Sequence, residues 1–138
     1  MLEAALRSDA LTSTSGGFEL RLGLPWIRSM PLTSVRELTL SIDGDPVATS
    51  HLHIVLGSRS VPPESLAEET GWWFLQDRLV LAGDRVLSPG VHAVAVGFRL
   101  LVPYLQAAPG APLVLPFSLE TELVLNSAPV PSVSLDVA

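Results

Sequence analysis

Residues 91–103 read VHAVAVGFRLLVP, and this stretch decides the fold class of the chain. Alternate positions from 94 onward are all apolar, which predicts a β-strand with one side on a core: Val94, Val96, Phe98, Leu100 and Val102. The intervening positions are nearly as apolar, with Arg99 as the one charged residue among them. A strand that is apolar on both sides is expected at the centre of a sheet, covered on both faces. Pro103 is expected to end it.

The same two-residue alternation recurs elsewhere in the chain. Apolar and polar positions alternate over 18–24, 38–43 and 52–56, and 115–125 is the cleanest amphipathic strand. Asp43-Gly44 predicts a hairpin turn between two of these strands, because glycine adopts the positive φ that such a turn requires.

Weaker signals complete the predicted fold. Short helical turns are expected at Leu2–Leu6 and Pro63–Glu69, and a last short strand at Val133–Val137. About seven strands with frequent turns indicate an all-β fold, a single β-sandwich with Greek-key or jelly-roll-like connections and one short helical segment. The domain spans residues 1–138, with residues 1–17 as a flexible N-terminal lead-in.

The composition argues against several classes of partner. All eight basic residues are arginine and the formal net charge is −6, so neither nucleic acid nor an anionic membrane is an expected partner. The chain has no cysteine, which suits a reducing compartment. No apolar run is long enough for a signal peptide or a membrane span, and we therefore expect a cytoplasmic protein.

Charged residues make up only 16% of the chain, whereas hydrophobic residues make up 48%. A small domain has a high surface-to-volume ratio and normally needs more charge to cover its surface. The excess apolar surface predicts a large, permanent interface with another protein.

Three histidines are candidate metal ligands. His51 and His53 lie two positions apart on a predicted strand and so share a face, and His92 follows Pro89-Gly90 as in the second motif of a cupin barrel. A cupin also needs a glutamate shortly after its paired histidines, and none is present here. We expect the pair on a solvent-exposed face with no metal, and a cupin-like metal enzyme remains the weaker alternative.

No set of residues indicates a catalytic centre. Carboxylate pairs such as Glu120 with Glu122 are best explained as a solvated strand face, and the sequence contains no nucleophile motif or phosphate-binding loop. These features argue against an enzyme that acts alone.

The aromatic residues and their neighbours are the best candidates for a binding surface. Tryptophan, tyrosine and arginine dominate protein interfaces, and we assign five residues to a partner interface: Trp26, Arg28, Trp72, Trp73 and Tyr104. Adjacent residues on a strand face opposite ways, so one of the two neighbouring tryptophans is expected in the core. A flat tryptophan also stacks on sugars, so a free-standing carbohydrate-binding β-sandwich is a further alternative.

Longer stretches resemble a known family. The sequence LPWIRSMPL at 24–32, the strand at 35–42 and DGDPV at 43–47 are similar to the β-subunits of bacterial C-glycoside deglycosidases. So are PGVH at 89–92 and RLLVPY at 99–104. The likeness extends from Phe18 to about Leu125 and rests on the order and spacing of these pieces.

The resemblance implies a non-catalytic β-sandwich that docks on a larger α-subunit to form a hetero-oligomer. In that family the α-subunit resembles sugar isomerase barrels and holds a divalent metal, expected to be manganese, with the acid–base residues. The complex is a carbon–carbon lyase that releases an aromatic aglycone, such as a flavonoid, from a 3-keto sugar. The keto group acidifies the adjacent proton, so that base abstraction and metal stabilisation of an enolate lead to elimination. The resemblance assigns no catalytic, cofactor or metal residue to this chain.

We expect two segments to form much of the contact with the α-subunit, Leu24–Pro31 and Gly71–Phe74. Both interrupt the two-residue alternation, and both place aromatic residues beside proline or glycine.

Overall fold

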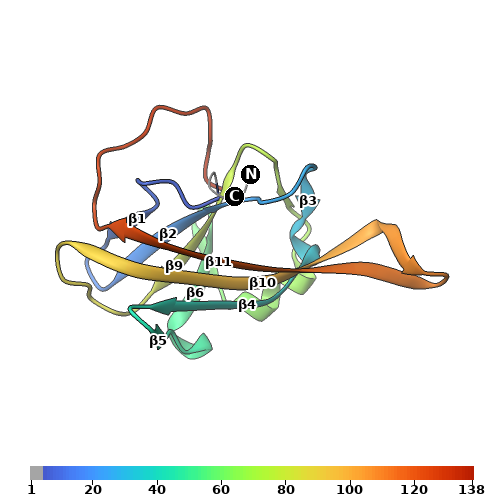
Figure 1. The fold of residues 1–138 in the computed structure, drawn as a ribbon, viewed down its shortest axis with the longest axis horizontal. Helices are drawn as coiled ribbons and strands as arrows, with labels where there is room; N and C mark the ends of the chain where they lie inside the picture. Colours follow the sequence, from blue (N-terminus) through green and yellow to red (C-terminus); the bar gives the residue numbers. More distant parts are fainter. Residues whose placement is uncertain (1–4) are drawn as a thin grey trace.

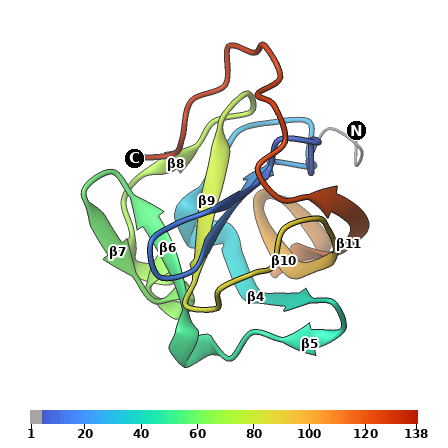
Figure 2. The same ribbon diagram turned by 90° about the vertical axis from the view of Figure 1, so that its left-hand side faces the viewer.

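The computed structural model describes residues 5–138 and has two antiparallel β-sheets that enclose one core (Figures 1 and 2). The strand order of the larger sheet is β1-β2-β9-β6-β7. These strands are β1 (Leu11–Ser13), β2 (Phe18–Gly23), β9 (Arg78–Gly83), β6 (Leu52–Leu56) and β7 (Arg59–Val61). The predicted all-β sandwich is confirmed.

The second sheet is built around the longest strand, β10 (Val91–Ala108). Its strand order is β11-β10-β4-β5, with β11 (Ala111–Val124), β4 (Val35–Ile42) and β5 (Asp45–Pro46). A separate two-stranded ribbon joins β3 (Met30–Pro31) to β8 (Trp72–Trp73).

Several predicted elements are confirmed in position and in the face that they bury. β2 and β6 bury every second residue, as their alternation predicts. The hairpin predicted between 38–43 and 52–56 is wrong in its second strand, because 52–56 is β6, which pairs with β7 and β9 in the other sheet. The turn itself is where it was predicted, from β4 into β5 at Asp43 and Gly44, which have φ values of 53° and 83°. Both are in the left-handed region that a two-residue hairpin needs, and glycine adopts it at little cost.

The core lies between the two sheets and contains the apolar side of β10. Phe98 stacks on Phe117 of β11 at 5.3 Å between ring centroids and contacts Trp73 of β8 at 6.1 Å. Phe18 of β2 is fully buried against Gly83 of β9, where a Cβ atom would lie 2.4 Å from the phenylalanine ring. The glycine therefore makes room for the aromatic ring at a strand pairing.

The prediction that β10 is covered on both faces is wrong. β10 is central in its sheet, but Ala93 and Arg99 on its second face are exposed. No other layer covers this face within residues 5–138, because the five-stranded sheet packs on the opposite side. Nor does the strand end at Pro103. It continues to Ala108, and the hairpin with β11 extends well beyond the rest of the molecule, at the right of Figure 1.

The N-terminal region also differs from the prediction. Leu11–Ser13 forms β1, which pairs with β2 through Leu11 and Leu20, and Ala10 is fully buried. These apolar side chains complete the edge of the core, so residues 10–13 belong to the sandwich and not to a lead-in. Most of the short helix predicted at Leu2–Leu6 lies outside the described residues.

The helical content is short and of the 3-10 type. The predicted turns at Pro63–Glu69 correspond to η4 (Pro63–Glu68). Two further 3-10 turns of three residues each, η2 (Leu32–Ser34) and η3 (Thr49–His51), occur in the described chain. Among these residues no helix is long and apolar enough to cross a bilayer.

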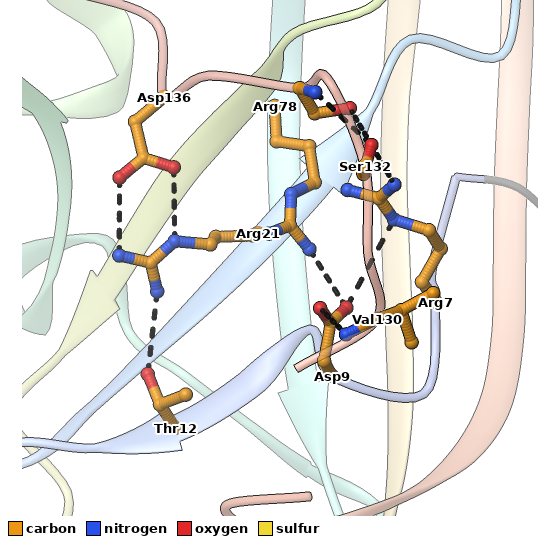
Figure 3. A network of polar contacts seen from close by, with 9 residues as sticks. Arg7, Asp9, Thr12, Arg21, Arg78, Val130, Ser132 and Asp136 are labelled. Carbon is orange, nitrogen blue, oxygen red and sulfur yellow. Dashed lines mark hydrogen bonds and ion pairs between the residues drawn. The ribbon is translucent and has the colours of Figure 1, made fainter. Parts of the chain in front are cut away.

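The C-terminal tail is fixed to the five-stranded sheet by arginine and aspartate side chains (Figure 3). Asp9 accepts hydrogen bonds from Arg78 at 3.0 Å and from the backbone N–H of Val130 at 2.9 Å. Arg21 pairs with both carboxylate oxygens of Asp136, at 3.0 and 3.2 Å. The strand predicted at Val133–Val137 is reduced to a single parallel bridge between Arg78 and Asp136, in which Arg78 forms backbone hydrogen bonds of 2.9 Å with Leu135 and Val137.

Candidate partner-docking site

Three of the predicted interface residues form one cluster. The indole Nε1 of Trp26 donates a hydrogen bond of 2.9 Å to the hydroxyl of Tyr104. The guanidinium carbon of Arg28 lies 5.2 Å from the centre of the Tyr104 ring, which is a cation–π distance. We call Trp26, Arg28 and Tyr104 the aromatic cluster.

The cluster is attached to the core and to β10. The Trp26 ring packs edge-on against Phe117, with 6.5 Å between centroids and an interplanar angle of 71°. Tyr104 lies in an irregular part of β10, where residues 103–105 fall between the paired positions Val102↔Leu113 and Gln106↔Pro112. Such a bulge redirects a side chain out of the regular alternation. Here it places Tyr104 over the loop that follows β2.

The two segments predicted to dock lie side by side. Met30 pairs with Trp73 and Pro31 with Trp72 in the β3–β8 ribbon. The backbone N–H of Leu75 also donates to the hydroxyl of Ser29 at 2.8 Å. One ribbon therefore joins segments that are about forty positions apart in the sequence, as a sheet commonly does.

The two neighbouring tryptophans have different environments. Trp73 is 0% exposed, and its indole N–H donates to the carbonyl of Asp77 at 3.1 Å. Its assignment to the interface is therefore wrong, because a fully buried ring cannot touch a partner. A sugar cannot stack on it either. Trp72 is 48% exposed and is available for contact.

Four further apolar side chains are exposed near the cluster. Two of them lie within the segments predicted to dock, but none was named as an interface residue from the sequence. Ile27 lies between the two cluster residues of the first segment, Phe74 and Leu75 follow β8, and Leu105 follows Tyr104. All four are exposed. The available signal was their position outside the two-residue alternation, where no sheet face requires an apolar side chain.

The charge of Arg28 is not balanced locally. Among residues 5–138, Arg21, Arg59, Arg78 and Arg99 each form an ion pair with a carboxylate. Arg28 instead lies over an aromatic ring, with no carboxylate partner in the described chain. The cluster therefore presents a planar cation surrounded by apolar groups, which suits a carboxylate on another molecule.

His92 has a structural environment. It is 5% exposed, with Nδ1 2.6 Å from Asp43 Oδ2 and Nε2 2.6 Å from the carbonyl oxygen of Ser88. Because both neighbours accept hydrogen bonds, this geometry favours a ring with both nitrogens protonated. The Ser88 carbonyl and then Asp43 raise the pKa of His92. The bond from His92 and the N–H of Ala93 lower the pKa of Asp43. A doubly protonated ring has no lone pair for a metal.

His51 and His53 both approach Asp84. Its Oδ2 atom lies 3.7 Å from Nδ1 of His51 and 3.3 Å from Nε2 of His53. His51 belongs to η3 and is exposed, and His53 is half-buried on β6. Within residues 5–138, no three His, Cys, Asp or Glu side chains lie close enough together to hold a metal ion. The cupin-like arrangement of His51, His53 and His92 is not assembled.

A cleft of about 540 Å³ lies beside η4 on the uncovered side of β4 and β10. Its lining includes Arg36, Glu37, Arg99 and apolar residues such as Leu101. Glu37 is already paired with Arg99 at 3.5 Å. This arrangement lacks a histidine or a positioned acid–base pair, so the cleft does not resemble a hydrolytic site.

Comparison with known proteins identifies the family. The family model described as "C-glycoside deglycosidase beta subunit" matches residues 3–104. The 3'-dehydrocarminate deglycosidase beta subunit of a Microbacterium species is 31% identical over 113 residues, which cover 80% of this chain and 85% of that protein.

Two further relatives carry the name C-glycoside deglycosidase beta subunit. The protein of Arthrobacter globiformis is 31% identical over 103 residues, 72% of this chain and 79% of the relative. The protein of Microbacterium trichothecenolyticum is 31% identical over 105 residues, 75% of this chain and 76% of the relative. On the strength of the family model and these relatives, the chain belongs to the C-glycoside deglycosidase beta subunit family.

Proposed function

We propose that this chain is the non-catalytic subunit of a heteromeric C-glycoside deglycosidase and acts by docking on a larger catalytic subunit. Each relative is named as a beta subunit, which supports a partner subunit for this chain as well. The histidines of the described chain are occupied in structural contacts, which supports a catalytic centre on the partner. The lack of cysteine favours a complex in the cytoplasm.

The proposed substrates are C-glycosides whose sugar has been oxidised to a 3-keto form. One relative is named as a 3'-dehydrocarminate deglycosidase beta subunit, which supports an oxidised glycoside as the substrate class. A carbonyl acidifies the neighbouring C–H bond, so a base on the catalytic subunit can start elimination of an aromatic aglycone, of the flavonoid type or another. The described residues of this chain do not fit a divalent metal. A metal of the manganese type and the acid–base groups are therefore proposed for the partner, an isomerase-like barrel, and the complex is a carbon–carbon lyase.

The aromatic cluster is the observation that carries the proposed docking mode. The Trp26–Tyr104 hydrogen bond and the contact of Arg28 with the ring hold three interface-type side chains in place before any partner arrives. Groups that are fixed in advance lose little entropy on binding. The exposed residues Ile27, Trp72 and Phe74 add apolar area. The partner is expected to place a carboxylate opposite Arg28.

Replacing Arg28 tests this docking mode. Arg28→Ala removes an exposed side chain that forms no ion pair in the described chain, so the melting temperature should stay unchanged. The dissociation constant for the purified catalytic subunit should rise about 30-fold, which corresponds to a hot spot of about 2 kcal/mol.

Arg85→Ala is the control, since the hydrogen bonds of Arg85 go to the backbone carbonyls of Asp45 and Pro46 in β5 and not to the cluster. Equal affinity of the Arg28 variant and the wild type would place the docking surface elsewhere. A wild-type chain that forms no complex with the catalytic subunit in gel filtration would refute the proposed function itself.

A further inference from the structure

The β10–β11 hairpin extends beyond the sheet that supports it. β4 pairs with β10 only as far as Val35↔Leu100, and beyond that point β10 pairs with β11 alone, ending at Ala108↔Ala111. Figure 1 shows this end of the hairpin projecting away from both sheets. All residues from Tyr104 to Pro112 are exposed. We call residues 104–112 the arm.

The arm lacks the charges that normally protect an exposed ribbon. Its sequence is YLQAAPGAP, and no charged residue occurs from Leu100 to Leu119. Isolated two-stranded ribbons are marginally stable in water, and native proteins protect exposed edges with charged side chains. An uncharged arm that is exposed on both faces is therefore suited to being covered by another protein.

The prolines of the arm indicate how another protein would contact it. Pro109 and Pro112 lack a backbone N–H and discourage the addition of a further strand. The arm is thus better suited to insertion between apolar side chains than to edge-to-edge pairing. Pro109-Gly110 closes the tip, with Gly110 at φ 78°, so the arm has a defined end rather than a long loose loop.

We infer that the arm inserts into an uncharged, apolar groove of the catalytic subunit; this inference rests on the proposed function. Tyr104 belongs to both the arm and the aromatic cluster, and its hydroxyl is bonded to Trp26. A partner that covers the cluster therefore meets the base of the arm. A second copy of the chain is a poorer occupant, because each copy has a net charge of −6 and two copies repel each other.

Charged substitutions on the arm test the inference. Ala107→Glu with Ala111→Glu, and separately Ala107→Arg with Ala111→Arg, place charges at exposed positions and should leave the melting temperature unchanged. Both pairs should raise the dissociation constant for the catalytic subunit at least 30-fold, because an apolar groove rejects either sign of charge. Val86→Glu with Val133→Glu is the control, at exposed apolar positions away from the arm, and should change the constant less than threefold.

A shortened arm provides the second variant, with residues 106–112 replaced by Asn-Gly and Tyr104 kept. It should fold, retain the cluster and bind at least 30-fold more weakly. If the charged and shortened variants bind the catalytic subunit as tightly as the wild type, the inference about the arm is wrong. If Arg28→Ala still weakens binding in that case, the proposed function is retained. If the variants change only the self-association of the isolated chain, the arm contacts a second copy of this chain, and the inference is also wrong. No binding by the wild type would refute both.

Discussion

At the scale of single residues, His92 shows how a buried contact fixes a protonation state. Its raised pKa means that its contribution to stability is complete below the ordinary value of 6.5 and is lost as the pH rises through the raised value. The lowered pKa of Asp43 means that its contribution is present above 3.8 and is lost as the pH falls through the lowered value. Both contributions are therefore fully present in mildly acidic solution.

Replacing His92 should accordingly produce a pH-dependent loss of stability. His92→Gln keeps a polar side chain but removes the charge that Asp43 and Ser88 bind. The melting temperature of the variant should fall furthest below that of the wild type at about pH 5, and the gap should narrow as the pH rises through the raised pKa of His92 and the wild-type ring loses its proton. His51→Gln serves as the control, because His51 is exposed and lies 3.7 Å from its carboxylate. A gap of constant size across this range would contradict the account.

The residue types of the candidate site can be predicted from the sequence, but the contacts among those residues cannot. Trp26, Arg28 and Tyr104 could be chosen from residue type alone, because interfaces favour these side chains. Their mutual contacts could not, since Tyr104 is far along the chain and reaches Trp26 only through the bulge in β10. For Trp72 and Trp73, alternation predicts opposite faces but does not say which ring is inside. The pairing of β8 with β3 decides that.

At the scale of elements, the C-terminal tail depends on one buried carboxylate. The side chain of Asp9 is 7% exposed and lies 3.0 Å from Arg78, and it also accepts the N–H of Val130. Burial alone would raise its pKa, but the bond from Val130 and the charge of Arg78 lower it overall. Asp9 therefore holds the tail and balances arginine charge at once.

Asp9→Ala should destabilise the fold by about 3 kcal/mol, because it leaves a buried guanidinium without its counter-ion. It should also release the tail, seen as faster proteolysis after about residue 126. Asp136→Ala removes a more exposed carboxylate, 49% accessible in its side chain, from Arg21 and should cost less than about 1 kcal/mol. Urea unfolding measures both losses. Equal effects of the two substitutions would show that burial does not set the contribution of Asp9.

Elements with a clear alternation were predictable, and those that depend on distant contacts were not. β2 and β6 and the turn at Gly44 follow from local sequence, since each buries one face or needs a positive φ. β1 was missed because its three residues carry too short a pattern, and only the pairing with β2 reveals it. β10 was predicted to end early because Pro103 lacks a donor, yet a bulge tolerates proline.

At the scale of the whole molecule, low charge and an uncovered sheet face lead to the same conclusion. The sequence has 16% charged residues, and the prediction of a second covering layer on β10 was wrong within this chain. The apolar character that prompted this prediction is real. Exposed apolar side chains occur at the hairpin end and in the loops around the aromatic cluster, where a partner subunit rather than the chain's own fold is proposed to cover them.

The most direct test of the account is the activity of a fixed amount of catalytic subunit on a 3-keto C-glycoside while this chain is added in increasing amounts. We expect no turnover by the chain alone. The activity of the catalytic subunit should rise to a plateau as this chain saturates it. With Arg28→Ala the curve should shift to about 30-fold higher concentration and reach the same plateau, because Arg28 acts on docking and not on chemistry. Turnover by the isolated chain, or a catalytic subunit whose activity does not respond to the chain, would contradict the account.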